Sequence, residues 1–156
     1  MTGAPDLVEA VVGFRAWRVV HGALLSPFIP CRWDGPVMHA ACYPANRALV
    51  FGRGWLSAPH APPHRDCRCG IYAYHRPGAQ PYYGEFESIL GVVTVWGRIE
   101  AHRDGLRAEH ARVCALARSP VAVPIAGRLG VDLVDPAELE DAAARYGAPL
   151  PPSLMP

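Results

Sequence analysis

Residues that bind soft metal ions are concentrated in the segment His60-Ala-Pro-Pro-His64-Arg-Asp-Cys67-Arg-Cys69-Gly70. Two thiols placed two positions apart on an extended chain point to the same side, so Cys67 and Cys69 can reach one ion. Gly70 has no Cβ, which helps the chain to bend close to a metal–sulfur centre. The segment therefore predicts a metal site, and zinc is the metal most often bound by thiolate and imidazole together.

The other ligands of this site are expected upstream of the cysteine pair. Cys42 is expected as the third ligand, because it lies on a predicted strand, Val37–Tyr43, before the proline-rich loop that leads to the cysteine pair. Either His60 or His64 supplies the fourth. A closed shell of three cysteines and one histidine has no open position for water or substrate, so it is typical of a structural site. Two alternatives stay open: an iron–sulfur centre that recruits Cys31, and a metal-free pair of reactive thiols.

A second group of titratable residues follows the strongest strand pattern in the sequence, Phe86–Ile99. His102 is a candidate general acid or base, with Glu100 or Glu109 orienting it. Arg107 is a candidate for holding an anionic ligand, or for pairing with Glu109. The plain alternative is a set of solvated charges at the start of a helix. If the protein is an enzyme, His102, Arg107 and Glu109 are its candidate catalytic residues.

Composition limits the possible classes of protein. The chain has 156 residues, of which 51% are hydrophobic, enough for one globular domain over residues 1–156 with its own core. The net charge is +1, which does not favour nucleic acid or an anionic membrane as partner. All 15 basic residues are arginine, as is typical of a GC-rich genome, and the lack of lysine excludes Schiff-base chemistry and a P-loop.

The expected location is the cytoplasm. Residues 1–6 have neither the charged nor the apolar region of a signal peptide, and the sequence has no apolar run of 18 residues that would cross a membrane. Thiols stay reduced in that compartment. The odd number of cysteines, five, also favours metal ligands and free thiols over disulfides.

Hydrophobic periodicity predicts an α+β fold: a mainly antiparallel sheet, a zinc-pinned loop and two C-terminal helices. Strands are expected at residues 8–20, 23–26, 37–43, 69–74 and 86–99, with His21-Gly22 as the turn of a first hairpin. Leu106–Arg118 is expected to be a helix with Asp104 as its N-cap, and Val121–Ile125 a short edge strand. A second helix is expected from Asp135 to Arg145, before a loose tail at residues 149–156.

Three segments of the chain resemble a family of small bacterial proteins found in actinobacteria and bacilli. They are Gly13–Val19 with Gly22–Pro27, Trp33 and Ala41-Cys42; His60-Ala61-Pro62 with Cys67–Ala73; and Val95–Ile99 with His102 and Gly105–Glu109. The resemblance implies that Cys42, His60, Cys67 and Cys69 are the ligand set, which favours His60 over His64. The chain departs from the family pattern between Cys42 and His60 and over Gly78–Gly84. The resemblance implies no activity.

Three functional hypotheses follow. The first is a zinc-stabilised binding or regulatory domain that is not an enzyme, with a functional surface formed by Arg98, His102, Arg107 and Glu109. Its partner would be a protein or a small anionic ligand. The second is a small enzyme that uses the same residues. The third is a hydrolase with a catalytic zinc on Cys42, Cys67 and Cys69, whose fourth position activates water.

Overall fold

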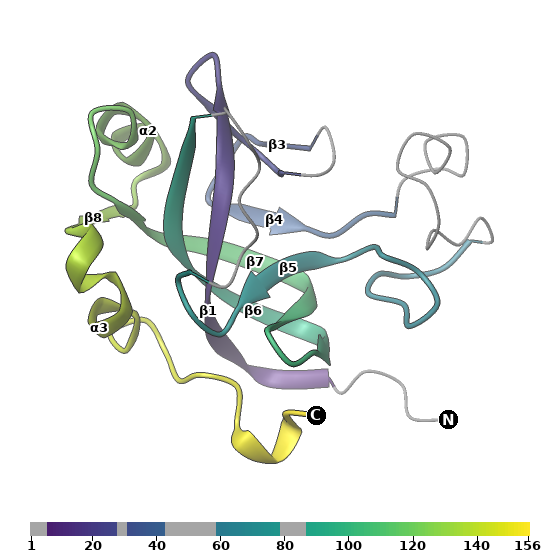
Figure 1. Ribbon diagram of the computed structural model, residues 1–156. Helices are drawn as coiled ribbons and strands as arrows, with labels where there is room; N and C mark the ends of the chain where they lie inside the picture. Colours follow the sequence, from purple (N-terminus) through teal and green to yellow (C-terminus); the bar gives the residue numbers. More distant parts are fainter. Residues whose placement is uncertain (1–5, 28–30, 43–58, 79–86) are drawn as a thin grey trace.

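The computed structural model describes residues 6–27, 31–42, 59–78 and 87–156, and most of these residues belong to one sheet (Figure 1). Within these ranges the sheet has eight strands: β1 (Asp6–Val20), β2 (Ala23–Leu25), β3 (Arg32–Trp33), β4 (Val37–His39), β5 (Ile71–Tyr74), β6 (Ser88–Ala101), β7 (Gly105–Ala117) and β8 (Asp132–Val134). Two α-helices follow β7: α2 (Ala122–Leu129) and α3 (Leu139–Ala143). Short 3₁₀ turns are formed by η1 (Pro136–Glu138) and η2 (Pro152–Leu154). The predicted α+β class with a mainly antiparallel sheet is confirmed.

The centre of the sheet is β6, which pairs in antiparallel fashion with β1 on one side and β7 on the other. Its middle residues Val92, Val93 and Val95 are completely buried, because side chains on both faces of this strand are covered. β5 pairs with β1 through Phe14 and with β7 along its whole length. The four strands β1, β5, β7 and β6 therefore form a closed cycle in which each strand pairs with the next. The predicted central strand is confirmed.

One predicted helix is wrong. Leu106–Arg118 does not form a helix: residues 105–117 are β7, which carries β6 on one edge and β5, β4 and β8 on the other. Leucine, alanine, arginine and glutamate favour a helix locally, but pairing on both edges outweighs that preference. Asp104 accordingly lies in the turn between β6 and β7 and caps no helix.

The predicted edge strand Val121–Ile125 is also wrong, because these residues begin α2. Pro124 occupies the first turn of this helix, where a missing N–H costs no intrahelical hydrogen bond. The Ser119 hydroxyl accepts a hydrogen bond from the Ala122 N–H at 3.1 Å, and Gly130 ends the helix in a left-handed conformation.

The second predicted helix is found in its expected place. The Asp135 carboxylate accepts a hydrogen bond from the Ala137 N–H at 2.9 Å and starts η1, which continues into α3. Within residues 149–156, Leu150 is buried in the core, and just before them the Ala148 carbonyl accepts a hydrogen bond from the Val12 N–H. No helix among the described residues is long and apolar enough to span a membrane.

The fold places the segments that carry the candidate metal ligands side by side. β5 pairs with residues 105–108 of β7, and β4 pairs with residues 110–112 on the same edge. Cys42 follows β4 and Cys69 precedes β5, so the shared edge of β7 brings the two cysteines together although 27 residues separate them.

Candidate metal centre and its anchors

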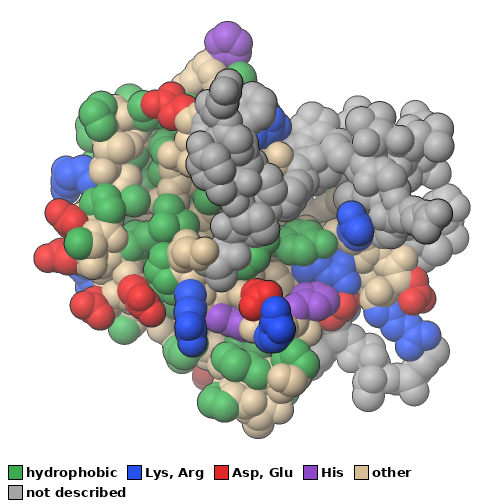
Figure 2. Space-filling view, in the orientation of Figure 1, with side chains coloured by type: hydrophobic (Ala, Val, Ile, Leu, Met, Phe, Trp, Pro, Cys, Tyr) green, Lys and Arg blue, Asp and Glu red, His purple; other side chains and the backbone are tan. Residues whose placement is uncertain are grey.

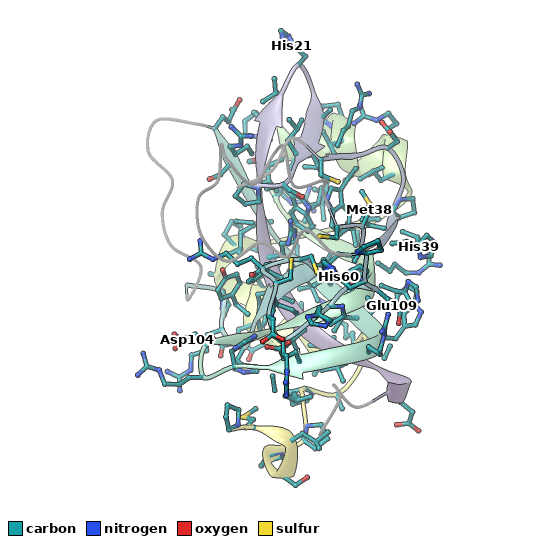
Figure 3. All side chains as sticks on the ribbon, turned by 90° about the vertical axis from the view of Figure 1, so that its right-hand side faces the viewer. His21, Met38, His39, His60, Asp104 and Glu109 are labelled. Carbon is teal, nitrogen blue, oxygen red and sulfur yellow. The ribbon has the colours of Figure 1, made fainter. Side chains whose placement is uncertain are left out.

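The four residues singled out as metal ligands lie together. The ligand atoms of Cys42, His60, Cys67 and Cys69 all lie within 4.8 Å of one another. Cys42 Sγ is 3.6 Å from Cys67 Sγ, and Cys69 Sγ is 3.3 Å from His60 Nε2. Figure 3 shows sulfur atoms beside His60, above the β6–β7 hairpin. This cluster can hold a metal ion.

Because they are buried, these thiols lose their protons less readily than a free cysteine unless a cation is present. Cys67 and Cys69 are buried, while Cys42 and His60 are half-buried. Burial is the main cause that raises the pKa of Cys69 to about 12, and the neighbouring Cys67 and Cys42 add to it. Burial, followed by the contact with Cys67, also raises the pKa of Cys42. A bound divalent cation reverses this preference, because it stabilises the thiolate form directly.

The two histidine candidates for the fourth ligand make different contacts in the structure. His60 directs Nε2 at Cys69 Sγ. His64 instead accepts a hydrogen bond from the Asp66 N–H through Nδ1 at 3.2 Å, as part of a local turn. Cys31 is not in the cluster, so the described residues bring three cysteines together and not the four that an iron–sulfur centre of the usual kind requires.

Arg107 anchors the metal loop, which we define as residues 59–70, to the sheet. Its guanidinium donates hydrogen bonds to the backbone carbonyls of Cys67 and Cys69, and a longer one to His64 at 3.4 Å. The same guanidinium lies 2.7 Å from the Glu100 carboxylate on the paired strand β6. Only 5% of the Arg107 side chain is exposed, so its charge is satisfied by Glu100 and the loop rather than by water.

A second arginine anchors the start of the same loop. Arg98 donates a hydrogen bond to the Pro62 carbonyl at 3.2 Å. Glu109 holds Arg98 in turn: its carboxylate accepts from the Arg98 backbone N–H at 3.2 Å and lies 3.5 Å from the Arg98 side chain. The backbone contact with Arg98 is the largest cause that lowers the pKa of Glu109. Two arginine–glutamate pairs on β6 and β7 thus hold the metal loop.

Of the three candidate catalytic residues, two come together: His102 and Arg107 both contact Glu100. His102 Nε2 lies 3.3 Å from the Glu100 carboxylate that also holds Arg107. Burial and then the charge of Arg107 lower the pKa of His102, although Glu100 opposes them. Glu109 pairs with Arg98 and not with His102 or Arg107, so of the two carboxylates proposed to orient His102, Glu100 is the one that contacts it.

A hollow of about 380 Å³ lies next to the metal loop. It is lined by Arg65, Asp66, Cys67, Arg68, Tyr72, Glu100, His102 and Arg107. In Figure 2, basic, acidic and histidine side chains gather on this part of the surface, where β5 and the adjoining loop lie in Figure 1. The Tyr72 hydroxyl donates a hydrogen bond to the Arg68 carbonyl at 2.9 Å, which ties the loop to β5.

The anchoring role of Arg98 and Arg107 was missed by the sequence analysis, which assigned both to a solvent-facing functional surface. A period-two reading of residues 105–117 would have placed Arg107 and Glu109 on one face of a strand. Only the pairing of β5 with β7 reveals that this face lies against the metal loop.

Comparison with known proteins adds no relative to this picture. No family model, no curated protein and no solved structure matches the chain.

Proposed function

We propose that this protein is a zinc-stabilised binding domain in which Cys42, His60, Cys67 and Cys69 hold one structural zinc ion. The separations of the ligand atoms carry the proposal. In a tetrahedral zinc site with ordinary bond lengths, two sulfurs lie about 3.8 Å apart and a sulfur and a nitrogen about 3.6 Å apart. Here Cys42 Sγ and Cys67 Sγ are 3.6 Å apart, Cys69 Sγ and His60 Nε2 are 3.3 Å apart, and all four ligand atoms lie within 4.8 Å of one another.

A closed donor set of this kind supports a structural role. Three thiolates and one imidazole fill the tetrahedral shell, so no position is left for a water molecule to be activated. The observation that His60 joins the three cysteines therefore disfavours a hydrolase with a catalytic zinc on Cys42, Cys67 and Cys69. The ion would join the metal loop to the end of β4. This link would add to the hydrogen bonds by which Arg98 and Arg107 hold the loop on β6 and β7.

We assign ligand binding to the hollow beside the metal loop, and a small anion as its ligand. Three arginines and two carboxylates are among its lining residues. A zinc ion with three thiolates carries one negative charge, but Cys67 and Cys69 are buried whereas Arg65 and Arg68 are exposed. Attraction would come from these exposed guanidinium groups, and it should weaken as ionic strength rises.

Metal analysis of the purified protein tests the structural site. We expect about one zinc ion per chain. The variants Cys67→Ser and Cys69→Ser should lose both the zinc and thermal stability, while Cys114→Ser should keep both. Cys114 is a matched control, because it is a half-buried thiol outside the cluster. A parent protein without bound metal, or a Cys69→Ser variant that keeps its zinc, would refute the proposal.

Cobalt substitution separates a structural ion from a catalytic one. The absorption spectrum of the Co²⁺ protein should not respond to added thiocyanate or azide, because a closed shell cannot admit an anion. A spectrum that changes as these anions saturate the site would support the catalytic alternative.

A further inference from the structure

A second group of metal-ligating atoms lies where β4 pairs with β7, on the edge of β7 that does not pair with β6. His39 of β4 and His110 of β7 are directly opposite each other in the antiparallel register. Their Nδ1 atoms are 2.8 Å apart, and their rings meet edge to face at 4.8 Å between centroids. His39 is exposed and His110 is half-buried, so both nitrogens are close to solvent.

The neighbours of His110 fix which of its nitrogens is free to bind a metal. The Glu109 carboxylate lies 3.6 Å from His110 Nε2, so it favours the tautomer with the proton on that nitrogen. Nδ1 then carries a lone pair directed at His39. The Trp96 ring also lies beside the His110 ring, with 5.6 Å between their centroids.

The distance between the two nitrogens is that of a hydrogen bond, and it also suits one coordination geometry better than another. With metal–nitrogen bonds of ordinary length, two ligands at a right angle lie about 2.9 Å apart, whereas tetrahedral ligands lie about 3.3 Å apart. The observed 2.8 Å fits the right angle of square-planar and octahedral ions. Ni²⁺ and Cu²⁺ prefer that geometry with nitrogen ligands, and Zn²⁺ in proteins does not.

We propose that His39 and His110 form a second metal site, which binds a divalent ion of the Ni²⁺ or Cu²⁺ type in two adjacent positions. The ion takes the place of the proton between the two Nδ1 atoms, and His39 then carries that proton on Nε2, so both imidazoles bind as neutral ligands. Glu109 acts as a positioning residue for His110. The site differs from the cysteine cluster in its ligands and its geometry, and it keeps free positions for water or for a further ligand.

The two sites are chemically distinct enough to be loaded separately. The cysteine cluster offers three soft sulfurs in a closed set, while the histidine pair offers two nitrogens and no sulfur. Ni²⁺ is the better probe, because Cu²⁺ can oxidise thiols. Ni²⁺ bound to thiolates absorbs strongly in the near ultraviolet, so the absence of that absorption would show that the ion has not entered the cysteine cluster.

Calorimetric titration of the zinc-loaded protein with Ni²⁺ tests the proposal. We expect one equivalent of Ni²⁺ per chain, bound without thiolate absorption and with quenching of tryptophan fluorescence through the nearby Trp96. The variants His39→Ala and His110→Ala should each abolish this binding event. Glu109→Gln should weaken it about tenfold, as expected for loss of a carboxylate that orients a ligand.

The control variant is His21→Asn. His21 lies in the β1–β2 turn at the top of the molecule in Figure 3, away from His39, and asparagine suits its positive φ of 49°. Ni²⁺ binding that is equally strong in the parent, His39→Ala and His110→Ala proteins would overturn the proposal, as would the lack of any binding to a folded parent. The zinc content of the protein does not affect this conclusion about Ni²⁺ binding, because the proteins compared differ only in these histidines.

Discussion

Replacement of Arg107 by methionine is the sharpest test of how the metal loop is held. Methionine has a similar length and fits an apolar surrounding, so it removes the donors without leaving a large cavity. The substitution removes the hydrogen bonds that Arg107 donates to the carbonyls of His64, Cys67 and Cys69. It also leaves the Glu100 carboxylate without its closest cation.

The size of the effect follows from the burial of the two partners. Removing one member of a buried ion pair costs about 3–5 kcal/mol. The lower half of this range applies, because 24% of the Glu100 side chain is exposed and His102 remains beside it. Hydrogen bonds to a charged group contribute about 1.5–3 kcal/mol, so about 2 kcal/mol of the loss belongs to the loop carbonyls. If zinc binding requires the loop in place, zinc affinity should fall roughly thirtyfold.

Two measurements check this reasoning. Denaturant unfolding of the zinc-loaded protein should show a loss of about 3–4 kcal/mol for Arg107→Met, and competition with a chelator should show the weaker zinc binding. The control Arg112→Met replaces an exposed arginine on the same strand and should change neither quantity. The reasoning is refuted if Arg107→Met destabilises the protein but leaves zinc affinity unchanged, since Arg107 would then not act through the loop.

Three further outcomes are expected. Gly105→Ala should destabilise the protein by about 1–3 kcal/mol in thermal unfolding, because a Cβ there would collide with the backbone of Ala73 and Tyr74. Gly127→Ala in α2 should instead stabilise it by up to about 1 kcal/mol, since the space around that position is open; equal effects of the two substitutions would contradict this account. NMR titration should give His102 a pKa below its usual value of about 6.5, and Arg107→Met should move it upwards. Because this pKa is lower in the folded state, the protein should lose stability as the pH falls through and below about 6.5, and His102→Gln should reduce that loss.

The sequence predicted local features well where one residue type settles them. Alternation identified β1 and β6, the His21-Gly22 dipeptide identified the first hairpin, and Asp135-Pro136 identified the start of the last helical segment. Each of these depends on residues that are neighbours in the chain. The cluster of Cys42, His60, Cys67 and Cys69 was also predictable in outline, because sulfur and imidazole groups are rare and their spacing limits the choice.

The errors arose where pairing between distant segments decides the structure. Residues 105–117 have the composition of a helix, but strands on both edges make them β7. Val121–Ile125 has β-branched residues and a proline that suit an edge strand, yet Ile125 fills the core from a helix. The partners of Arg107 could not be predicted, because they belong to the metal loop and to β6, which only the folded sheet brings together.

The pairing of β4 and β5 along one edge of β7 has a consequence for how this protein can vary. In the proposed zinc-bound state the distance between these strands is set by the sheet and by the ion that joins Cys42 to Cys69, and not by the length of the chain between them. Doubling the number of residues between Cys42 and His60 should cost only about 0.6 kcal/mol in closure entropy. A peptide tag inserted between Cys42 and His60 should therefore leave the pairing of β4 and β5 with β7 unchanged.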